Sequence, residues 1–267
     1  MKNKLIIILT MLITTTFLYS EKIVMEGSTT VLPIAQKAAE VYMKKFPDKE
    51  IVVRGSGSGV GIAAIIDGNC DIANASRSIK DKELELAKKK KRELKGHIIA
   101  MDGLAIIVHP SNKIDNITKE ELQKIYTGKI KNWKELGGDD RKIVVISRES
   151  SSGTYEFFLE YVLDKKRVHP RSVMQSTTQG VVKMVSQTPG AIGYVGYGYI
   201  SDKVKVLKYE GVEPTIESII KNKYKLARPL YMYTLTNAKK EVLEFINFVK
   251  SPEGQKIVEE AGYIPLK

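Results

Sequence analysis

Cysteine is almost absent from this chain, and histidine is scarce. Cys70 is the single cysteine among 267 residues, which rules out a disulfide bond within the chain. The three histidines, His97, His109 and His169, lie far apart in the sequence, without the close spacing that zinc ligands need. The sequence therefore predicts no zinc or iron site of the usual kinds, and no cofactor.

Long apolar runs are lacking except near the N-terminus. Lys2 and Lys4 precede an apolar stretch at residues 5–18, and the small residue Ser20 follows it. The stretch is shorter than the about 20 residues of a transmembrane helix, and the charged, apolar and small segments together are typical of a secretory signal peptide. We predict that residues 1–20 are this signal and that the mature chain works in the periplasm. An uncleaved signal that tethers the chain to the membrane is the alternative.

Acidic residues are too few to balance the basic ones. The chain has 43 Lys and Arg against 31 Asp and Glu, a formal net charge of +12 at pH 7. Such an excess is compatible with nucleic acid, an anionic membrane surface or an anionic ligand as partner. Nucleic acid is not expected, because aromatic residues are not interleaved with the basic ones. The densest basic run, residues 88–92, continues a predicted surface helix that has Ser78 and Asp81 at its start in capping-box spacing. We interpret this run as the solvated face of that helix. A contact with lipid head groups or with a membrane partner is the alternative interpretation.

Short apolar runs alternate with helical patterns along the rest of the chain. Residues 22–25, 50–53, 70–74 and 141–147 have the character of strands, and each is followed by a segment with helical character. This alternation predicts an α/β protein with mainly parallel strands. The chain length suits one or two domains.

Four of the predicted strand-to-helix turns are rich in serine, threonine and glycine. They cover residues 27–30, 55–61, 75–78 and 150–154. In open α/β sheets, ligands bind beside the carboxyl ends of the strands, where such turns gather. Helix N-termini offer free N–H groups, hydroxyl groups add donors, and glycine lets the backbone approach an anion closely. Because Arg77 and Arg148 add positive charge, the turns predict a site for a small anion.

Three other interpretations of these turns have less support. Serine and threonine before a helix are often plain caps. The glycine-rich loop at residues 55–61 lacks the ending of a P-loop and the acidic partner of a dinucleotide-binding motif. Ser151 or Ser152 could be a nucleophile, but neither lies in the Gly-x-Ser-x-Gly motif of a nucleophile elbow. The histidines are scattered along the sequence and offer no identifiable base. Binding is therefore favoured over catalysis.

Several longer motifs carry a resemblance to a known family. The motifs are GSTT (27–30), the loop at 55–61, DIANASR (71–77), IYTGKIKNW (125–133), RESSSGT (148–154) and PGAIGYVGYGYI (189–200). In order and over nearly the whole mature chain, they resemble the phosphate-binding proteins (PstS) of bacterial phosphate ABC transporters. The resemblance implies a type II periplasmic binding protein fold, in which a hinge of two crossing strands joins two α/β lobes and the ligand lies in the cleft. We expect lobe I at residues 21–103 and 202–267, and lobe II at residues 104–201.

The same resemblance implies a phosphate site made of hydroxyl groups, backbone N–H groups and arginine. Its expected residues are Thr29, Thr30, Ser58, Ser76, Arg77, Arg148, Ser152, Gly153 and Thr154. Arg148 would pair with the anion. Ser76 stands where some members of the family have an aspartate that accepts the phosphate proton. Arg77 either contacts phosphate or braces its loop through a carboxylate such as Asp71.

The function that the resemblance implies is that of a receptor and not of an enzyme. It would capture inorganic phosphate outside the cytoplasm as a monomer and deliver it to the membrane permease of an ABC transporter. Two alternatives stay open at this stage. One is a receptor of the same fold for another oxyanion, such as sulfate or molybdate, and the other is a secreted hydrolase that uses Ser151 or Ser152.

Overall fold

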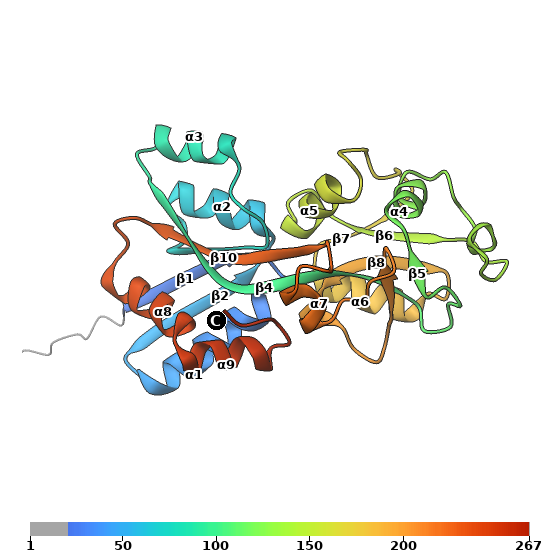
Figure 1. Ribbon diagram of the computed structural model, residues 1–267. Helices are drawn as coiled ribbons and strands as arrows, with labels where there is room; N and C mark the ends of the chain where they lie inside the picture. Colours follow the sequence, from blue (N-terminus) through green and yellow to red (C-terminus); the bar gives the residue numbers. More distant parts are fainter. Residues whose placement is uncertain (1–20, 267) are drawn as a thin grey trace, which may run out of the picture.

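The protein is built as two lobes joined by two strands that cross between them (Figure 1). This computed structural model describes residues 21–266, and the predicted signal peptide at residues 1–20 lies outside that range. Within the described range, no helix combines the length and the apolar character that a membrane span requires.

The first lobe carries three parallel strands and a core of its own. Its elements are β1 (Glu21–Gly27), α1 (Leu32–Lys45), β2 (Lys49–Gly55), α2 (Ser58–Asp67), β3 (Ile72–Ala75), α3 (Asp81–Lys89), α8 (Lys240–Lys250) and α9 (Pro252–Glu260). The strands pair in the order β2-β1-β3, and both pairs are parallel. Ile34, Ala38 and Tyr42 recur at helical spacing on α1, are at most 4% exposed, and pack in one cluster with residues of β1, α8 and α9.

The second lobe repeats this arrangement around a separate core. Its elements are β5 (Asn116–Ile117), α4 (Lys119–Tyr126), η1 (Trp133–Leu136), β6 (Val144–Arg148), α5 (Gly153–Tyr161), β7 (Val173–Gln175), α6 (Thr178–Gln187), β8 (Ala191–Gly196), η2 (Tyr197–Tyr199), β9 (Lys205–Tyr209) and α7 (Ile216–Ile220). β6 pairs in parallel with both β7 and β8. The buried Trp133 anchors this core, and its indole N–H donates to the Gly190 carbonyl oxygen at 3.0 Å.

The crossing strands are β4 (Leu94–Val108) and β10 (Ala227–Leu235). The part of β4 up to Gly103 pairs antiparallel with β10, and the part after it pairs antiparallel with β8. At the crossing, Asp102 of β4 stands directly opposite Arg228 of β10. The α/β class that the sequence pattern predicted is therefore confirmed, and so are the two lobes and the two-strand hinge that the family resemblance implied.

The chain returns to the first lobe later than predicted. β9 pairs with β4, and Leu207, Tyr209 and Tyr224 are buried in the same cluster as residues of α4 and β4. The residues between position 202 and β10 therefore belong to the second lobe, because their apolar side chains are buried there. The structure thus corrects the predicted boundary at residue 202 to the start of β10 at Ala227.

The lysine-rich helix α3 also begins differently from the prediction. Its N-cap is Lys80 and not Ser78, whose hydroxyl oxygen lies 3.2 Å from the hydroxyl oxygen of Tyr231. The Glu83 carboxylate accepts a hydrogen bond from the Lys80 backbone N–H at 2.9 Å, so a free donor at the helix start is satisfied without a serine cap.

Candidate functional site

The serine- and threonine-rich turns meet where the two lobes face each other. The turns after β1, β2 and β3 come from the first lobe, and the turn after β6 comes from the second. The predicted hydroxyl residues and Arg148 are each at most 3% exposed: Thr29, Thr30, Ser58, Ser76, Arg148, Ser152 and Thr154. Buried polar groups at this density need hydrogen-bond partners, and most of them find these partners across the junction.

The first turn is held rigidly by its neighbours. Gly27 has φ +136°, and a Cβ atom there would lie 2.2 Å from the Asn74 carbonyl oxygen, so only glycine fits this close approach. The hydroxyl group of Tyr199 donates to the Thr29 carbonyl oxygen at 2.6 Å, and that of Tyr263 donates to the Thr30 carbonyl oxygen at 2.6 Å. Both threonine side chains are therefore presented to the second lobe from a fixed backbone.

Hydroxyl groups of the two lobes are hydrogen-bonded to each other. The Oγ1 atoms of Thr29 and Thr178 lie 2.9 Å apart, and those of Thr30 and Thr154 lie 2.9 Å apart. Besides these side-chain contacts, the backbone N–H of Gly59 donates to the Ser151 carbonyl oxygen at 2.9 Å. The described structure is therefore one in which the lobes are closed against each other.

Ser58, Ser76 and Gly153 converge on one point of this junction. The Ser76 backbone N–H donates to Ser58 Oγ at 3.0 Å, and Ser76 Oγ lies 3.4 Å from Thr154 Oγ1. Ser152 caps α5, since its Oγ accepts from the Tyr155 backbone N–H at 3.3 Å. The N-terminus of α5, which begins at Gly153, therefore lies beside the hydroxyl groups of Ser58 and Ser76 of the first lobe.

Replacing Gly153 by alanine is expected to prevent full closure of the lobes. A Cβ atom at Gly153 would lie 2.3 Å from Ser58 Oγ and 2.8 Å from Ser76 Oγ, and both serines are fully buried, so neither can move aside freely. We expect ligand affinity to fall about 100-fold, because misplaced donors lose hydrogen bonds at several turns together. Titration calorimetry measures the loss. The matched control is Gly137→Ala, at a surface position where no atom lies within 4 Å of the added Cβ. Its φ of +84° strains alanine, so this variant is expected to lose some stability and to leave affinity unchanged.

Arg148 is a buried cation whose hydrogen-bond partners are all neutral within residues 21–266. Its guanidinium group donates to the carbonyl oxygens of Gln175 and Ser176 and to the hydroxyl oxygens of Thr29 and Thr178, at 2.9–3.1 Å. These bonds fix its position between the lobes. No carboxylate is among these hydrogen-bond partners, and the negative charge of Glu149 acts on Arg148 without a hydrogen bond to it.

The pKa of Arg148 reflects this imbalance. Burial lowers the pKa of Arg148 to about 10, Tyr194 opposes the shift, and the positive charge of Arg228 adds to it. Desolvation and a neighbouring like charge both disfavour the charged form of a base. An anion held at this point would counteract both effects, so the site is electrostatically suited to a negative ligand.

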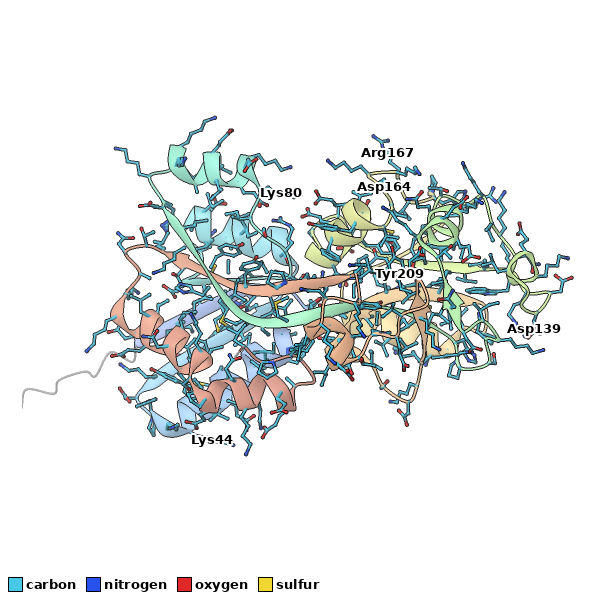
Figure 2. All side chains as sticks on the ribbon, in the orientation of Figure 1. Lys44, Lys80, Asp139, Asp164, Arg167 and Tyr209 are labelled. Carbon is cyan, nitrogen blue, oxygen red and sulfur yellow. The ribbon has the colours of Figure 1, made fainter. Side chains whose placement is uncertain are left out.

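Arg77, unlike Arg148, forms ion pairs with carboxylates. Its guanidinium group donates to both carboxylate oxygens of Glu83, at 2.9 and 2.7 Å, and forms an ion pair with Glu156 of the second lobe. Lys80 also pairs with Glu156, at 2.6 Å, and Figure 2 shows Lys80 on the edge of the first lobe that faces the second. Arg77 thus braces the rim through Glu83 and Glu156 and not through Asp71, and we leave it out of the proposed ligand set.

Sequence reasoning missed two residues of this junction, Thr178 and Arg228, and did not place Asp102 opposite Arg228. Thr178 begins α6 in the segment STTQG (176–180), a hydroxyl-rich turn after a strand, so the pattern that found the other turns could have found it. Asp102 and Arg228 are buried in the middle of the crossing strands. Their positions carry no local motif, and no sequence signal could have shown that they pair.

A hydrolase or a metal site finds no support in this geometry. The histidines are placed elsewhere, since His97 contacts Thr234 and His109 contacts Ser111, while His169 lies against Gly128. Within residues 21–266, no group of three or more His, Cys, Asp or Glu side chains is arranged to hold a metal ion.

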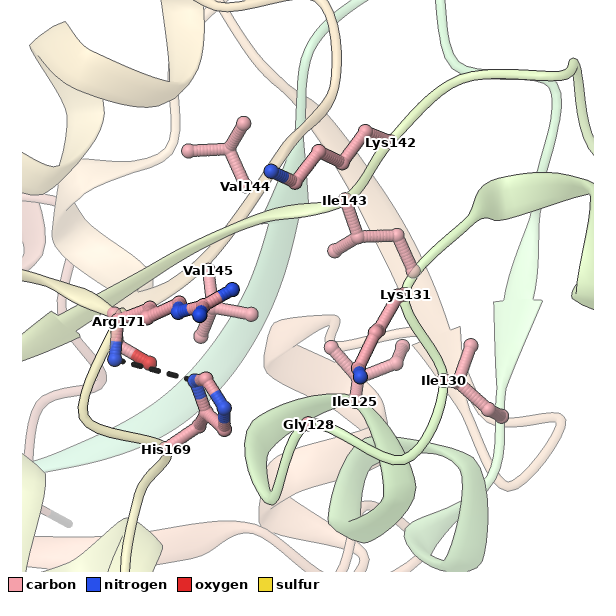
Figure 3. Close-up of a pocket in the computed structure, with 11 residues that line it drawn as sticks. Ile125, Gly128, Ile130, Lys131, Lys142, Ile143, Val144, Val145, His169 and Arg171 are labelled. Atoms are coloured by element: carbon pink, nitrogen blue, oxygen red, sulfur yellow. Dashed lines mark hydrogen bonds between the residues drawn. The ribbon is translucent and has the colours of Figure 1, made fainter.

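A separate pocket of about 190 Å³ lies on the second lobe (Figure 3). Its lining combines apolar side chains such as Ile143 and Val145 with the basic residues Lys131, Lys142 and Arg171. None of the predicted ligand residues lines this pocket, so it is distinct from the junction of the lobes.

Two α/β lobes on crossing strands, with buried hydroxyl groups and an unbalanced arginine between them, define a two-lobed binding protein for a small anion. A sequence profile of the PBP superfamily domain matches residues 18–253. The phosphate-binding protein PstS of Bacillus subtilis (strain 168) is 37% identical over 249 residues, which cover 92% of this chain and 81% of that protein. PstS of Staphylococcus aureus (strain USA300) is 36% identical, with 90% and 76% covered.

Solved structures agree with these matches. A protein from Clostridium perfringens, described as a phosphate ABC transporter substrate-binding protein with bound phosphate, superposes with a TM-score of 0.86 at 36% identity, and 92% of this chain and 100% of that one are covered. A phosphate transport receptor from Vibrio cholerae gives a TM-score of 0.76 at 34% identity, with 91% and 100% covered. This chain belongs to the PBP superfamily and, within it, to the PstS family of phosphate-binding proteins.

Proposed function

We propose that this chain captures inorganic phosphate outside the cytoplasmic membrane, as a monomer, and delivers it to the permease of an ABC transporter. The relatives named above are described as phosphate-binding proteins, as a phosphate ABC transporter substrate-binding protein and as a phosphate transport receptor. The observation that carries the proposal for this chain is Arg148, a cation 1% exposed and bound only to neutral groups within residues 21–266. A buried charge of this kind is stabilised when an anion completes its surroundings.

The proposed ligand set places donors on both sides of the anion. Its members are Thr29, Thr30, Ser58, Ser76, Arg148, Ser152, Gly153 and Thr154, with Thr178 added from the structure. Phosphate oxygens would take the place of the hydroxyl–hydroxyl hydrogen bonds that now join the lobes. The N-termini of α2, α5 and α6 add N–H groups and the positive ends of their dipoles. Because the donors are divided between the lobes, the ligand stabilises the closed form.

The rim ion pairs of Glu156 support the same motion. Glu156 lies on α5 of the second lobe, whereas Arg77 and Lys80 lie beside α3 of the first. These pairs can form only when the lobes are closed. They therefore add to the stability of the closed form.

A receptor for another oxyanion is the second candidate, and Ser76 is the observation that favours it. A hydroxyl group can donate to sulfate as readily as it accepts from the proton of hydrogen phosphate, so Ser76 by itself does not select phosphate. Asp102, a buried carboxylate nearby, accepts from Arg228 and from the Tyr197 backbone N–H, which leaves it little capacity to accept from a ligand.

Titration calorimetry with phosphate, sulfate and molybdate tests the proposal. We expect phosphate to bind in a ratio near one per chain and to be released in that ratio when freshly purified protein is denatured. Small-angle scattering is expected to give a smaller radius of gyration with saturating phosphate than without it. Tighter binding of sulfate or molybdate than of phosphate would identify the second candidate as correct. Absence of binding to all three anions would refute both.

A further inference from the structure

Arg228 is a second buried guanidinium group at the junction of the lobes. It is 2% exposed and lies on the crossing strand β10, directly opposite Asp102 on β4. Its Nε and Nη2 atoms donate to Asp102 Oδ2 at 3.0 and 2.9 Å. The ring of Phe157, from α5 of the second lobe, lies 5.2 Å from its central carbon. Arg228 is thus held at the hinge and reaches the second lobe.

One edge of this guanidinium group is not used by Asp102. Nη2 also donates to Thr154 Oγ1 at 3.0 Å, and Nη1 is buried with no hydrogen-bond partner within residues 21–266. The guanidinium group is planar and rigid, so Nη1 and Nη2 each carry one N–H that points in the same direction. The N–H of Nη2 that donates to Thr154 therefore has a parallel N–H on Nη1. The unused donor is therefore directed to the side of Arg228 where Thr154, a proposed ligand residue, lies.

Asp102 cannot supply the missing partner. Its carboxylate accepts from Arg228 through two N–H groups and from the backbone N–H groups of Tyr197 and Gly103. Burial raises the pKa of Asp102, while these four donors oppose the rise. A carboxylate has about four acceptor positions, so these donors occupy the positions that a proton or a further donor would need.

We propose that the Nη1–Nη2 edge of Arg228 is a second arginine contact for the bound anion, in addition to Arg148. The proximity of the two arginines agrees with this, since the charge of Arg228 acts on Arg148. Arg228 rests on a crossing strand, so this contact also ties the ligand to the hinge. The inference rests on the proposed function, because it concerns the same phosphate site.

Titration calorimetry with inorganic phosphate on the chain without the predicted signal peptide tests the inference. It compares two variants whose expected effects on phosphate affinity differ. Arg228→Gln is expected to weaken phosphate binding at least about 30-fold, the effect of losing one partner of a buried charge pair. Asp102→Asn is expected to keep or increase phosphate affinity, because it removes a negative charge and frees Arg228, although it lowers the melting temperature without ligand. The matched control Arg54→Gln removes a charge from a side chain that is 60% exposed and is expected to change affinity less than about twofold.

If Arg228 and Asp102 form only a structural ion pair, Arg228→Gln and Asp102→Asn are expected to weaken phosphate binding to a similar degree. That result overturns the inference.

If a single variant does not fold, the double variant with both substitutions replaces the pair by neutral amides and leaves no lone buried charge. We expect it to bind phosphate at least about tenfold more weakly than the parent. Binding equal to that of the parent overturns the inference while the proposed function stands. A parent chain that does not bind phosphate overturns both.

Discussion

Replacing Arg148 by alanine is expected to weaken phosphate binding by about 30-fold to several thousand-fold. Removing one partner of a buried charge pair costs about 2 to 5 kcal/mol, because the anion is left without a formal counter-charge where water cannot replace it. The loss extends beyond the charge, since Arg148 also orders Thr29 of the first lobe and Thr178 of the second. Titration calorimetry of the variant with phosphate measures the effect.

The control for Arg148 is a positive charge on the outer surface. Replacing exposed Lys89 or Lys90 on the basic run at the end of α3 is expected to change phosphate affinity little, because salt screens distant charges. If Arg148→Ala binds phosphate as tightly as the parent, the proposed site is wrong. If the lysine variants lose as much affinity as Arg148→Ala, the field of the whole chain and not the buried contact governs binding.

Replacing Ser76 by aspartate is expected to sharpen the choice between phosphate and sulfate. Ser76 is fully buried, next to Ser58 and Thr154, so a carboxylate there would meet the anion directly. It could accept the proton of hydrogen phosphate, whereas sulfate has none to offer and would be repelled. Selectivity that depends on leaving buried polar groups unpaired can reach about 10⁴-fold. Competition calorimetry with excess sulfate compares the variant with the parent.

The pH dependence gives this variant a second readout. Parent affinity is expected to change little between about pH 6 and 8, because the proposed ligand set contains no carboxylate. In Ser76→Asp, phosphate affinity is expected to fall at low pH, where protonation removes the acceptor. Complete rejection of sulfate by the parent would contradict this view of Ser76, and another acceptor near the junction, such as Glu149, would then be the selector.

Much of the architecture could be predicted because its causes act over short distances in the chain. The apolar spacing of α1 follows from the helical period, and the starts of α5 and α6 after the N-caps Ser152 and Thr177 follow from the preference of hydroxyl side chains for N-caps. The start of α3 could not be predicted from Ser78, because Glu83 performs the capping and Ser78 instead contacts Tyr231, 153 residues away. The return to the first lobe was misplaced because the strand character of β9 does not say which core it joins.

The sequence by itself determined that hydroxyl-rich turns follow the strands, that helices start at these turns, and that arginine stands beside two of them. Those properties depend on backbone preferences of glycine, serine and threonine within a few residues. Only the tertiary structure decided which charges meet. It pairs Arg77 with Glu156 across the rim, sets Arg228 against Asp102, and leaves Arg148 with neutral partners in the described chain. These outcomes depend on the strand order and on the crossing of β4 and β10, which brings together Asp102 and Arg228, 126 positions apart. No local pattern specifies such pairings.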